Sequence, residues 1–267
     1  MSDDWQSQRE LKFFEAENDS PSVLTQEQIQ SFNERGYLLP FDIYDQAEAD
    51  RNRKYFDRLL EDVQQEGRNE YSINGYHSQS QGIWDICTHP QILNIIGDLI
   101  GPDFVAWGTH YFCKLANDSK SVPWHQDASY WPLTPSKTVT AWLAIDDADQ
   151  DNSAMKVVAG SHRKGHLAFE NAPNHEQVVL NQQVIDAEDH GEVAYMEMNA
   201  GQISVHSDML IHGSDPNTSD RRRCGLTIRY APVDVRCLHA WNTKSIWCRG
   251  EDSTGHWANL PRPTATK

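Results

Sequence analysis

The most constraining feature of this chain is a change of hydrophobic pattern at Gly101. After this residue come short segments, several rich in β-branched and aromatic residues, separated by Gly, Pro, Asn and Asp. Such a pattern is typical of strands in a sandwich or barrel, and it predicts a mainly β fold of the jelly-roll type. Strands are expected at Phe104 to Leu115, Thr138 to Ile145, Met155 to Val158, Val193 to Met198, Gln202 to His206 and Gly225 to Tyr230.

Helices are expected before Gly101, where apolar residues recur at helical spacing. Thr25 followed by Gln28 forms a capping-box pattern, and Gly36 supplies the stop that ends the first helix. A longer amphipathic pattern follows, and a third helix opens at a proline. We expect these helices to cover a sheet, at about Gln26 to Arg35, Gln46 to Gln65, and Pro90 to just before Gly101.

Length and composition favour one domain. At 267 residues the chain can bury a sizeable core, and no Pro/Gly/Ser-rich linker divides it. We expect a single domain over 1–267, with a helical N-terminal part at about 25–101 and a jelly-roll core at about 102–235. The acidic start has no signal-peptide pattern, and no stretch reaches membrane-spanning length. The five cysteines contain no C-x-x-C, so we expect reduced thiols and a cytoplasmic location.

One pair of side chains is spaced for binding a metal ion. Residues i and i+2 of a strand point to the same side, so His125 and Asp127 would lie roughly 6.6 Å apart along one face, with Gln126 pointing away. A distant histidine from another strand would complete the set, and two imidazoles with one carboxylate suit Fe(II). An H-x-D tripeptide alone is weak evidence, because a strand end with solvated polar side chains has the same sequence.

Two sequence blocks make this prediction more specific. They are Pro123-Trp124-His125-Gln126-Asp127 continuing through Trp131 to Asp147, and Ile211-His212-Gly213-Ser214 continuing through Asn217 to Arg221-Arg222-Arg223 and Arg229-Tyr230. Together they resemble the phytanoyl-CoA dioxygenase family of Fe(II)/2-oxoglutarate oxygenases, and the resemblance covers most of the chain. It implies that the jelly roll is a double-stranded β-helix, cupin-like in form, and that Fe(II) and 2-oxoglutarate are the cofactor and co-substrate.

The resemblance implies a set of site residues. His125, Asp127 and His212 would be the iron ligands. Arg223, eleven residues after His212, would hold the far carboxylate of 2-oxoglutarate, a task that suits the planar fork of a guanidinium. His206 competes with His212 as a ligand, but it lacks the Gly-Ser continuation that marks the match.

Alternatives stay open at the co-substrate positions. Arg221 and Arg222 are neighbours of Arg223, and strand alternation leaves Arg221 on the same side as Arg223, so only the spacing from the histidine favours Arg223. Ser214 and Trp142 resemble family positions near the co-substrate. Their alternative interpretations are a turn serine and a core indole.

The retained carboxylate of Asp127 distinguishes two reactions. Halogenases similar to this family carry a small residue at that position so that chloride can bind the iron. Hydroxylation is therefore favoured over halogenation, with 2-oxoglutarate and O2 consumed, succinate and CO2 released, and a hydroxyl added to the substrate. The resemblance thus implies a single catalytic domain, a dioxygenase acting as a hydroxylase on a small molecule.

The net charge of the protein limits the classes of substrate and partner. The formal charge of −16 argues against nucleic acid as a partner and weighs against a CoA thioester, whose phosphates call for basic surface. We expect a small polar or zwitterionic metabolite: an amine, an amino-acid derivative or an organophosphonate. Several arginines could still cluster to form a locally positive pocket, although such residues more often form ion pairs with acids. These arginines are Arg221, Arg222, Arg229, Arg236 and Arg249.

Tyr130 and Trp131 are the expected substrate contacts, because they follow two of the implied iron ligands within a few residues. An aromatic wall holding a quaternary ammonium is a further possibility, although core packing is the more common fate of such rings. Its candidate members are Trp84, Trp107, Trp131, Trp241, Tyr71 and Tyr76.

Two other classes of protein remain open. One is a cupin-like metal-binding protein without oxygenase activity, which would have no use for Arg223. The other is a metal-dependent hydrolase or isomerase. Dependence on 2-oxoglutarate separates the oxygenase from both. We expect no membrane partner, and the sequence leaves the oligomeric state open.

Overall fold

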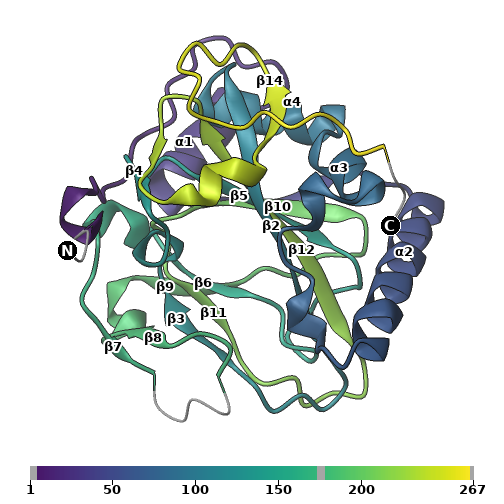
Figure 1. The fold of residues 1–267 in the computed structure, drawn as a ribbon. Helices are drawn as coiled ribbons and strands as arrows, with labels where there is room; N and C mark the ends of the chain where they lie inside the picture. The colour runs from purple at the N-terminus through teal and green to yellow at the C-terminus, as the bar shows by residue number, and fades with distance from the viewer. Residues whose placement is uncertain (1–4, 173–177, 265–267) are drawn as a thin grey trace.

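Two antiparallel sheets, one larger and one smaller, form the centre of the protein (Figure 1). The computed structural model describes residues 5–172 and 178–264. The larger sheet has the order β1-β10-β5-β12-β2-β14, with bounds β1 (Tyr37–Asp42), β10 (Gln202–Ser207), β5 (Val139–Ala144), β12 (Arg223–Pro232), β2 (Phe104–Lys114) and β14 (Ile246–Arg249). The smaller sheet has the order β3-β11-β6-β9, with bounds β3 (Val122–His125), β11 (His212–Ser214), β6 (Lys156–Ala159) and β9 (Glu192–Tyr195).

Two short two-stranded sheets complete the β structure. They are β4 (Leu133–Thr134) with β13 (Arg236–Cys237), and β7 (Phe169–Asn171) with β8 (Gln182–Val184). This is the mainly β, cupin-like double-stranded β-helix with added helices that the sequence predicted.

The helices cover the outer face of the larger sheet (Figure 1). Apolar side chains from α2 and α4, such as Phe56 and Ile96, share one buried cluster with Leu143 and Leu226 of β5 and β12. The capping box of Thr25 and Gln28 forms as predicted, and Gly36 ends the first helix with φ of 86°. The second helix has a capping box as well, formed by Asp45 and Glu48. The helices are α1 (Gln26–Arg35), α2 (Gln46–Gln65), α3 (Gln81–Cys87) and α4 (Pro90–Ile100).

The sequence prediction missed α3, β1 and several short strands, which are β4, β7, β8, β13 and β14. The seven residues of α3 are too few to show a helical period. β1 contains Pro40, which argues against a strand, but β1 is the edge strand of the sheet and its register shifts between Leu38 and Phe41. Proline is tolerated at such edges and bulges because no ladder hydrogen bond is lost.

Side chains along β12 point alternately into the hydrophobic core and into the space between the two sheets. Cys224, Leu226, Ile228 and Tyr230 pack outward against the helices. The alternate residues therefore face the space between the two sheets, and they are Arg223, Gly225, Thr227 and Arg229.

Within 5–172 and 178–264, no helix is long and apolar enough to cross a membrane. Helical and β residues share the same buried cluster, which supports a single domain. The domain limits at about 25–101 and 102–235 stay a prediction. All five cysteines are free thiols, and four of them are buried.

Candidate active site

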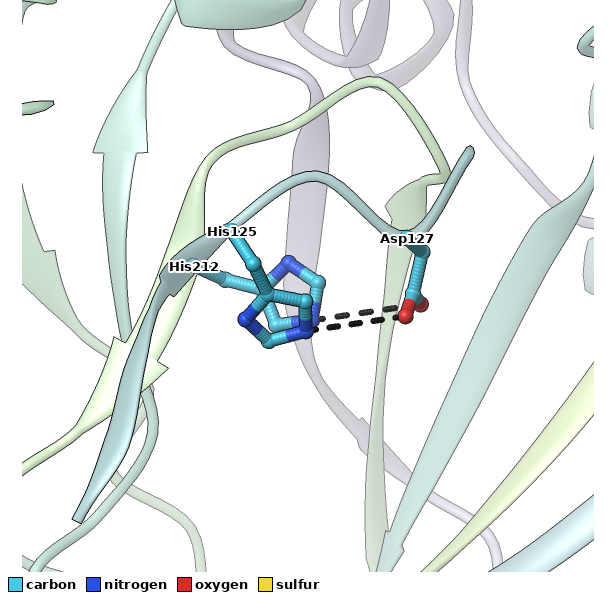
Figure 2. Close-up of side chains that lie close together, drawn as sticks. All are labelled: His125, Asp127 and His212. Atoms are coloured by element: carbon cyan, nitrogen blue, oxygen red, sulfur yellow. Dashed lines mark ion pairs between the residues drawn. The ribbon is translucent and has the colours of Figure 1, made fainter. Parts of the chain in front are cut away.

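Three of the predicted residues converge between the sheets. His125, Asp127 and His212 turn their side chains toward one another (Figure 2). His125 Nε2 lies 3.6 Å from one oxygen of Asp127, and His212 Nε2 lies 3.9 Å from the other. One ligand atom from each of the three lies within 4.8 Å of those of the other two. Both histidines are buried.

The backbone brings the two histidines together directly. β3 and β11 run antiparallel, and His125 is the cross-strand partner of His212. Each ring donates a hydrogen bond from Nδ1 to a backbone carbonyl two residues earlier, that of Pro123 at 2.8 Å and that of Leu210 at 3.0 Å. This bond fixes the tautomer and leaves Nε2 with its lone pair toward the carboxylate, as a metal-binding imidazole requires.

The predicted strand through Asp127 is only partly present. β3 ends at His125, and Asp127 begins the short 3-10 helix η4 (Asp127–Ser129). Gln126 remains extended, with φ of −107° and ψ of 126°, so His125 and Asp127 still face the same side. The Gln126 side chain points away and is buried, donating to the carbonyls of Gly165 and Met209. Tight hydrogen bonding of Gln126 therefore fixes the loop that carries Asp127.

The N-terminal segment supports the same loop. Arg9 Nη1 donates to the carbonyls of Ala128, Ser129 and Trp131 at 2.6, 3.2 and 3.0 Å. Nothing in the sequence pattern indicated this contact, because it joins residues about 120 positions apart. The segment before the first helix thus stabilises the turn after Asp127.

The electrostatics of the three residues suit a divalent cation. Burial lowers the pKa of His212 to about 3, so its imidazole is neutral near pH 7. Burial raises the pKa of Asp127, but His212 and His125 outweigh this effect and the resulting pKa lies well below its usual range. Neutral imidazoles and an ionised carboxylate are the protonation states that bind metal.

The donor set fits Fe(II). Donors at roughly 2.1 Å from one ion lie between roughly 3.0 and 4.2 Å apart, and the two measured separations of 3.6 and 3.9 Å fall in this range. Two histidines and one carboxylate on one side of an ion leave positions open for other ligands. The geometry therefore permits a three-residue iron site with room for a co-substrate.

His206 lies next to this cluster without being part of it. Its Nε2 is 4.0 Å from Asp127, and neither of its ring nitrogens has a hydrogen-bond partner within the described residues. Burial lowers the pKa of His206 to about 4. The metal-ligand grouping contains His212 and not His206, which agrees with the preference drawn from the sequence.

Arg223 is buried beside the cluster and is held by three acceptors. Its Nε donates to the Ser153 carbonyl at 3.0 Å, Nη1 to the Phe112 carbonyl at 3.3 Å and Nη2 to Ser214 Oγ at 3.3 Å. No carboxylate lies within ion-pair distance of it among the described residues. Since a guanidinium has five N–H donors, two remain for an anionic ligand in the cavity.

Trp142 lies beside the Arg223 guanidinium in the wall of the same cavity. The Arg223 guanidinium lies 5.9 Å from the centroid of the Trp142 ring, and both residues line the same cavity as the histidines. A Cβ on Gly225 would lie 2.0 Å from Trp142 Cζ2, so only glycine lets the indole lie flat on β12. The structure thus brings Ser214 and Trp142 together with Arg223, as predicted.

The two competing arginines are occupied elsewhere. Arg221 pairs with Asp149 at 2.7 Å on the surface, and Arg222 pairs with Asp57 and Asp146. Neither side chain lines the cavity next to His125. Arg223 is the one of the three that faces the cavity.

A second, larger cavity of about 580 Å³ adjoins the first at Asp127, Phe112 and Arg229. Tyr130 and Trp131, the expected substrate contacts, both line it, together with Trp107 and Trp241 of the expected aromatic wall. Trp84, Tyr71 and Tyr76 do not line it. The Tyr130 hydroxyl accepts a hydrogen bond from the backbone of Gln182 at 2.8 Å, which fixes its ring.

Sequence reasoning left Arg229 open as a member of a locally positive pocket and took an ion pair as its more common arrangement. The expectation of an ion pair was right for Arg221 and Arg222, but no acid lies within 4.0 Å of Arg229 among the described residues. Arg229 instead lines both cavities. Alternation from Arg223 along β12 was the available signal, because residues at i, i+2, i+4 and i+6 share one face.

The chain is similar to known oxygenases in sequence. The family model for phytanoyl-CoA dioxygenase matches residues 32–225. Phytanoyl-CoA dioxygenase, peroxisomal, from Homo sapiens is 26% identical over 247 residues, which cover 83% of this chain and 72% of that protein. L-proline trans-4-hydroxylase from Streptomyces griseoviridis is 24% identical over 186 residues, covering 63% and 69% respectively.

Similarity extends to solved structures. The apo form of the non-heme monooxygenase ThoJ superposes with a TM-score of 0.75 at 27% identity, covering 88% of each chain. The likeness therefore includes the two-sheet core and the helices around it.

Proposed function

The chain belongs to the phytanoyl-CoA dioxygenase family and is a dioxygenase that uses Fe(II) and 2-oxoglutarate, and we propose that it hydroxylates a small polar or zwitterionic metabolite at the site described above. The observation that carries the proposal is the cavity of about 580 Å³ that begins at Asp127. Its volume is typical of sites for small ligands, which range from roughly 300 to 1,000 Å³. An amine, an amino-acid derivative or an organophosphonate has the right size.

We assign the metal to His125, Asp127 and His212. The tautomers of both rings and the ionised carboxylate support this assignment. The chemistry that bound Fe(II) would supply is the activation of O2, in which 2-oxoglutarate gives up two electrons and takes one oxygen atom as it becomes succinate and CO2, and the other oxygen atom enters a C–H bond of the substrate. The protein supplies placement of the reactants and exclusion of competing reactions.

We assign the far carboxylate of 2-oxoglutarate to Arg223, with Ser214 and Trp142 beside it. Three hydrogen bonds hold the guanidinium in one orientation, so its two free N–H groups are preorganised for a carboxylate. The Ser214 hydroxyl already accepts from Arg223 and can donate its own proton to the same ligand.

We assign substrate contacts to Tyr130 and Trp131. Tyr130 stands edge-on to His125, with ring centroids 5.9 Å apart, so it borders both the metal ligands and the larger cavity. Trp131 is buried in the wall of that cavity. A substrate there lies next to the open side of the metal site, where its C–H bond and O2 can meet.

The proline hydroxylase relative supports a zwitterionic substrate, since proline itself is a small zwitterion. The CoA thioester named for the human relative fits less well, because the cavity is small and the protein is strongly acidic at −16. A protein that only binds metal would have no use for Arg223, a buried guanidinium with no acidic partner among the described residues. The cytoplasmic location stays a prediction, supported by the five free thiols.

Succinate formation tests the proposal. Protein loaded with Fe(II) in the absence of oxygen receives 2-oxoglutarate and one candidate substrate at a time, drawn from small amines, amino acids and phosphonates, and is then exposed to air. We expect substrate-stimulated succinate in the wild type, its loss in His212→Ala and Arg223→Ala, and a hydroxylated product 16 Da heavier by mass spectrometry (roughly one oxygen atom).

The two variants fail for different reasons, and this can be measured. His212→Ala should lose Fe(II) binding, whereas Arg223→Ala should bind Fe(II) but not 2-oxoglutarate. Metal binding by the wild type with no 2-oxoglutarate binding would overturn the proposal and favour a hydrolase or a metal-binding protein.

A further inference from the structure

Arg229 is a cation without a partner in the wall of the larger cavity. None of its nitrogens forms a hydrogen bond or an ion pair with any described residue, and its Nε is buried. An unpaired buried polar group costs free energy, and a charged one costs more. The Arg229 guanidinium is unpaired in the free protein, so its N–H donors are available to a ligand in the cavity.

The surroundings of Arg229 fix where the guanidinium lies. It stands 5.1 Å from the ring centroid of Trp131 and 5.7 Å from that of Trp107, so it lies over two indole faces. Its side chain also passes over Gly108 on the neighbouring strand, where a Cβ would lie 3.6 Å from Arg229 Cδ. Aromatic rings hold the cation in position without using its N–H donors.

This placement counts against a quaternary ammonium as the substrate group. The indole faces that would bind such a cation by cation-π attraction already face the Arg229 guanidinium. A second cation in the same cavity would be repelled by the first. The aromatic wall therefore orients an arginine and does not serve as a cation cage.

The count of charges in and around the larger cavity also favours an anionic substrate over a cationic one. Asp127 and the two carboxylates of 2-oxoglutarate compensate the charges of Fe(II) and Arg223. The positive charge of Arg229 then has no counterpart, and Lys244 at the rim of the cavity adds another. Among the described residues that line this cavity, the single acid is Asp127. In a protein with a net charge of −16, this cavity is a positive region.

We infer that the substrate carries an oxyanion group, a carboxylate, phosphonate or sulfonate, which Arg229 binds through its guanidinium fork while the apolar body of the substrate packs against Trp107, Trp131 and Trp241. This inference rests on the proposed function and narrows it. The substrate is an organic acid, with or without an amino group, and simple amines are excluded. Planar oxyanions match the spacing of the guanidinium N–H groups, and such pairs are strong when water is excluded.

The same inference defines how the substrate is oriented. Arg229 and Asp127 line both cavities, so an anion on Arg229 lies at their junction, beside the metal ligands. The bond that is oxidised must then be close to the acid group. Hydroxylation at a carbon one or two bonds from the oxyanion is the expected outcome.

Three probes with one carbon skeleton test the inference: 3-phenylpropionate, its neutral amide, and 3-phenylpropylamine. Their binding is measured by calorimetry without oxygen, both to protein loaded with Fe(II) and 2-oxoglutarate and to metal-free protein. We expect the acid to bind about 10- to 100-fold more tightly than the amide, the range that a charged hydrogen-bonded contact provides. The amine should bind most weakly.

Two substitutions at Arg229 and one control make the test specific. Arg229→Gln should abolish the preference for the acid, and Arg229→Lys should retain part of it. Arg236→Gln removes the same charge from an exposed position on β13, outside the cavity, and should leave the preference unchanged. Circular dichroism checks that each variant is folded.

Equal binding of acid and amide, tighter binding of the amine, or an acid preference that survives in Arg229→Gln would each overturn the inference. Failure of the proposed function has a different signature. In that case the wild type fails to bind 2-oxoglutarate at all, while the metal-free protein can still prefer the acid through Arg229.

Discussion

His125 and His212 are direct cross-strand partners, with ring centroids 4.1 Å apart. A single backbone register therefore sets the distance between the two imidazoles, and a slip of one residue would turn one of them to the opposite face. The carbonyl that each ring contacts lies two residues earlier in its own strand or turn. Pairing within the smaller sheet thus sets the positions of the two imidazoles, whereas Asp127 lies beyond β3 in a loop that Gln126 and Arg9 hold in place.

Arg223→Gln should weaken 2-oxoglutarate binding by about 10- to 100-fold, because a charge-assisted contact is replaced by a neutral one. Calorimetric titration of the Fe(II)-loaded protein without oxygen measures the change in Kd. Arg221→Gln removes the same charge two residues away, from an exposed pair with Asp149. Its effect should be less than about fivefold, and equal effects of the two variants would contradict the assignment.

Gly225→Ala should damage the same subsite through packing. The new methyl group would lie 2.0 Å from Trp142 Cζ2, so the indole must leave its place on β12. Overpacking of this kind costs about 1 to 3 kcal/mol. We expect a lower thermal midpoint together with weaker 2-oxoglutarate binding.

Gly108→Ala is the matched control on the neighbouring strand. Its Cβ would lie 3.6 Å from the Arg229 side chain, which is ordinary contact. The thermal midpoint of Gly108→Ala should therefore change little. A stable Gly225→Ala protein with unchanged 2-oxoglutarate affinity would show that Trp142 does not border the co-substrate.

Arg9→Gln should loosen the turn that carries Asp127. The substitution removes the charge and the Nη1 contacts with the carbonyls of Ala128, Ser129 and Trp131. Supporting contacts of this type typically change metal affinity by about tenfold or more when lost. Hydrogen exchange of the amides from 128 to 131 should become faster, and the Kd for Fe(II) should rise. Lys12→Gln, in an exposed pair with Glu10, should change neither.

The metal-free protein should lose stability as the pH falls below about 6.5, in part because of His77. Burial lowers the pKa of His77 from its ordinary value of 6.5 to about 4. Between these values the unfolded state binds more protons than the folded state, so stability falls by about 1.4 kcal/mol per pH unit for this group. Stability from this source is complete above the unfolded pKa.

Urea unfolding at pH 7 and pH 5 measures the effect. His77→Gln removes the titrating ring, so the difference in unfolding free energy between the two pH values should shrink by about 2 kcal/mol. The loss of the His77 Nδ1 contact with Thr109 affects both pH values alike. An unchanged difference would show that His77 is protonated equally in both states.

Local sequence rules located most of the α-helices and the longest strands. The caps at Thr25 and Gly36 act over a few residues, and the observed helix has the predicted limits, Gln26–Arg35. Alternation in β12 depends only on backbone geometry. The edge strand β1 was missed because Pro40 is unfavourable in the interior of a sheet, and sequence alone does not show that a strand lies at an edge.

The candidate metal residues followed from the sequence as well. The spacing of His125 and Asp127 is local, and the resemblance of the block around His212 supplied the third. Their convergence in one site agrees with that prediction, while their role in binding iron stays a proposal. Arg223 was chosen by its spacing from His212, and the structure separates it from Arg221 and Arg222 by giving those two acidic partners.

By itself, the sequence determined the mainly β type of fold, because periodicity and capping are encoded by neighbouring residues. Its resemblance to the phytanoyl-CoA dioxygenase family supplied the three candidate ligands and the class of reaction. Only the tertiary structure decided that Arg9 supports the Asp127 turn and that Arg229 remains unpaired in a cavity walled by tryptophans. Whether a charged side chain finds a partner depends on residues far away in the chain. In an acidic protein every arginine has many potential partners, and packing determines which arginines are left without one.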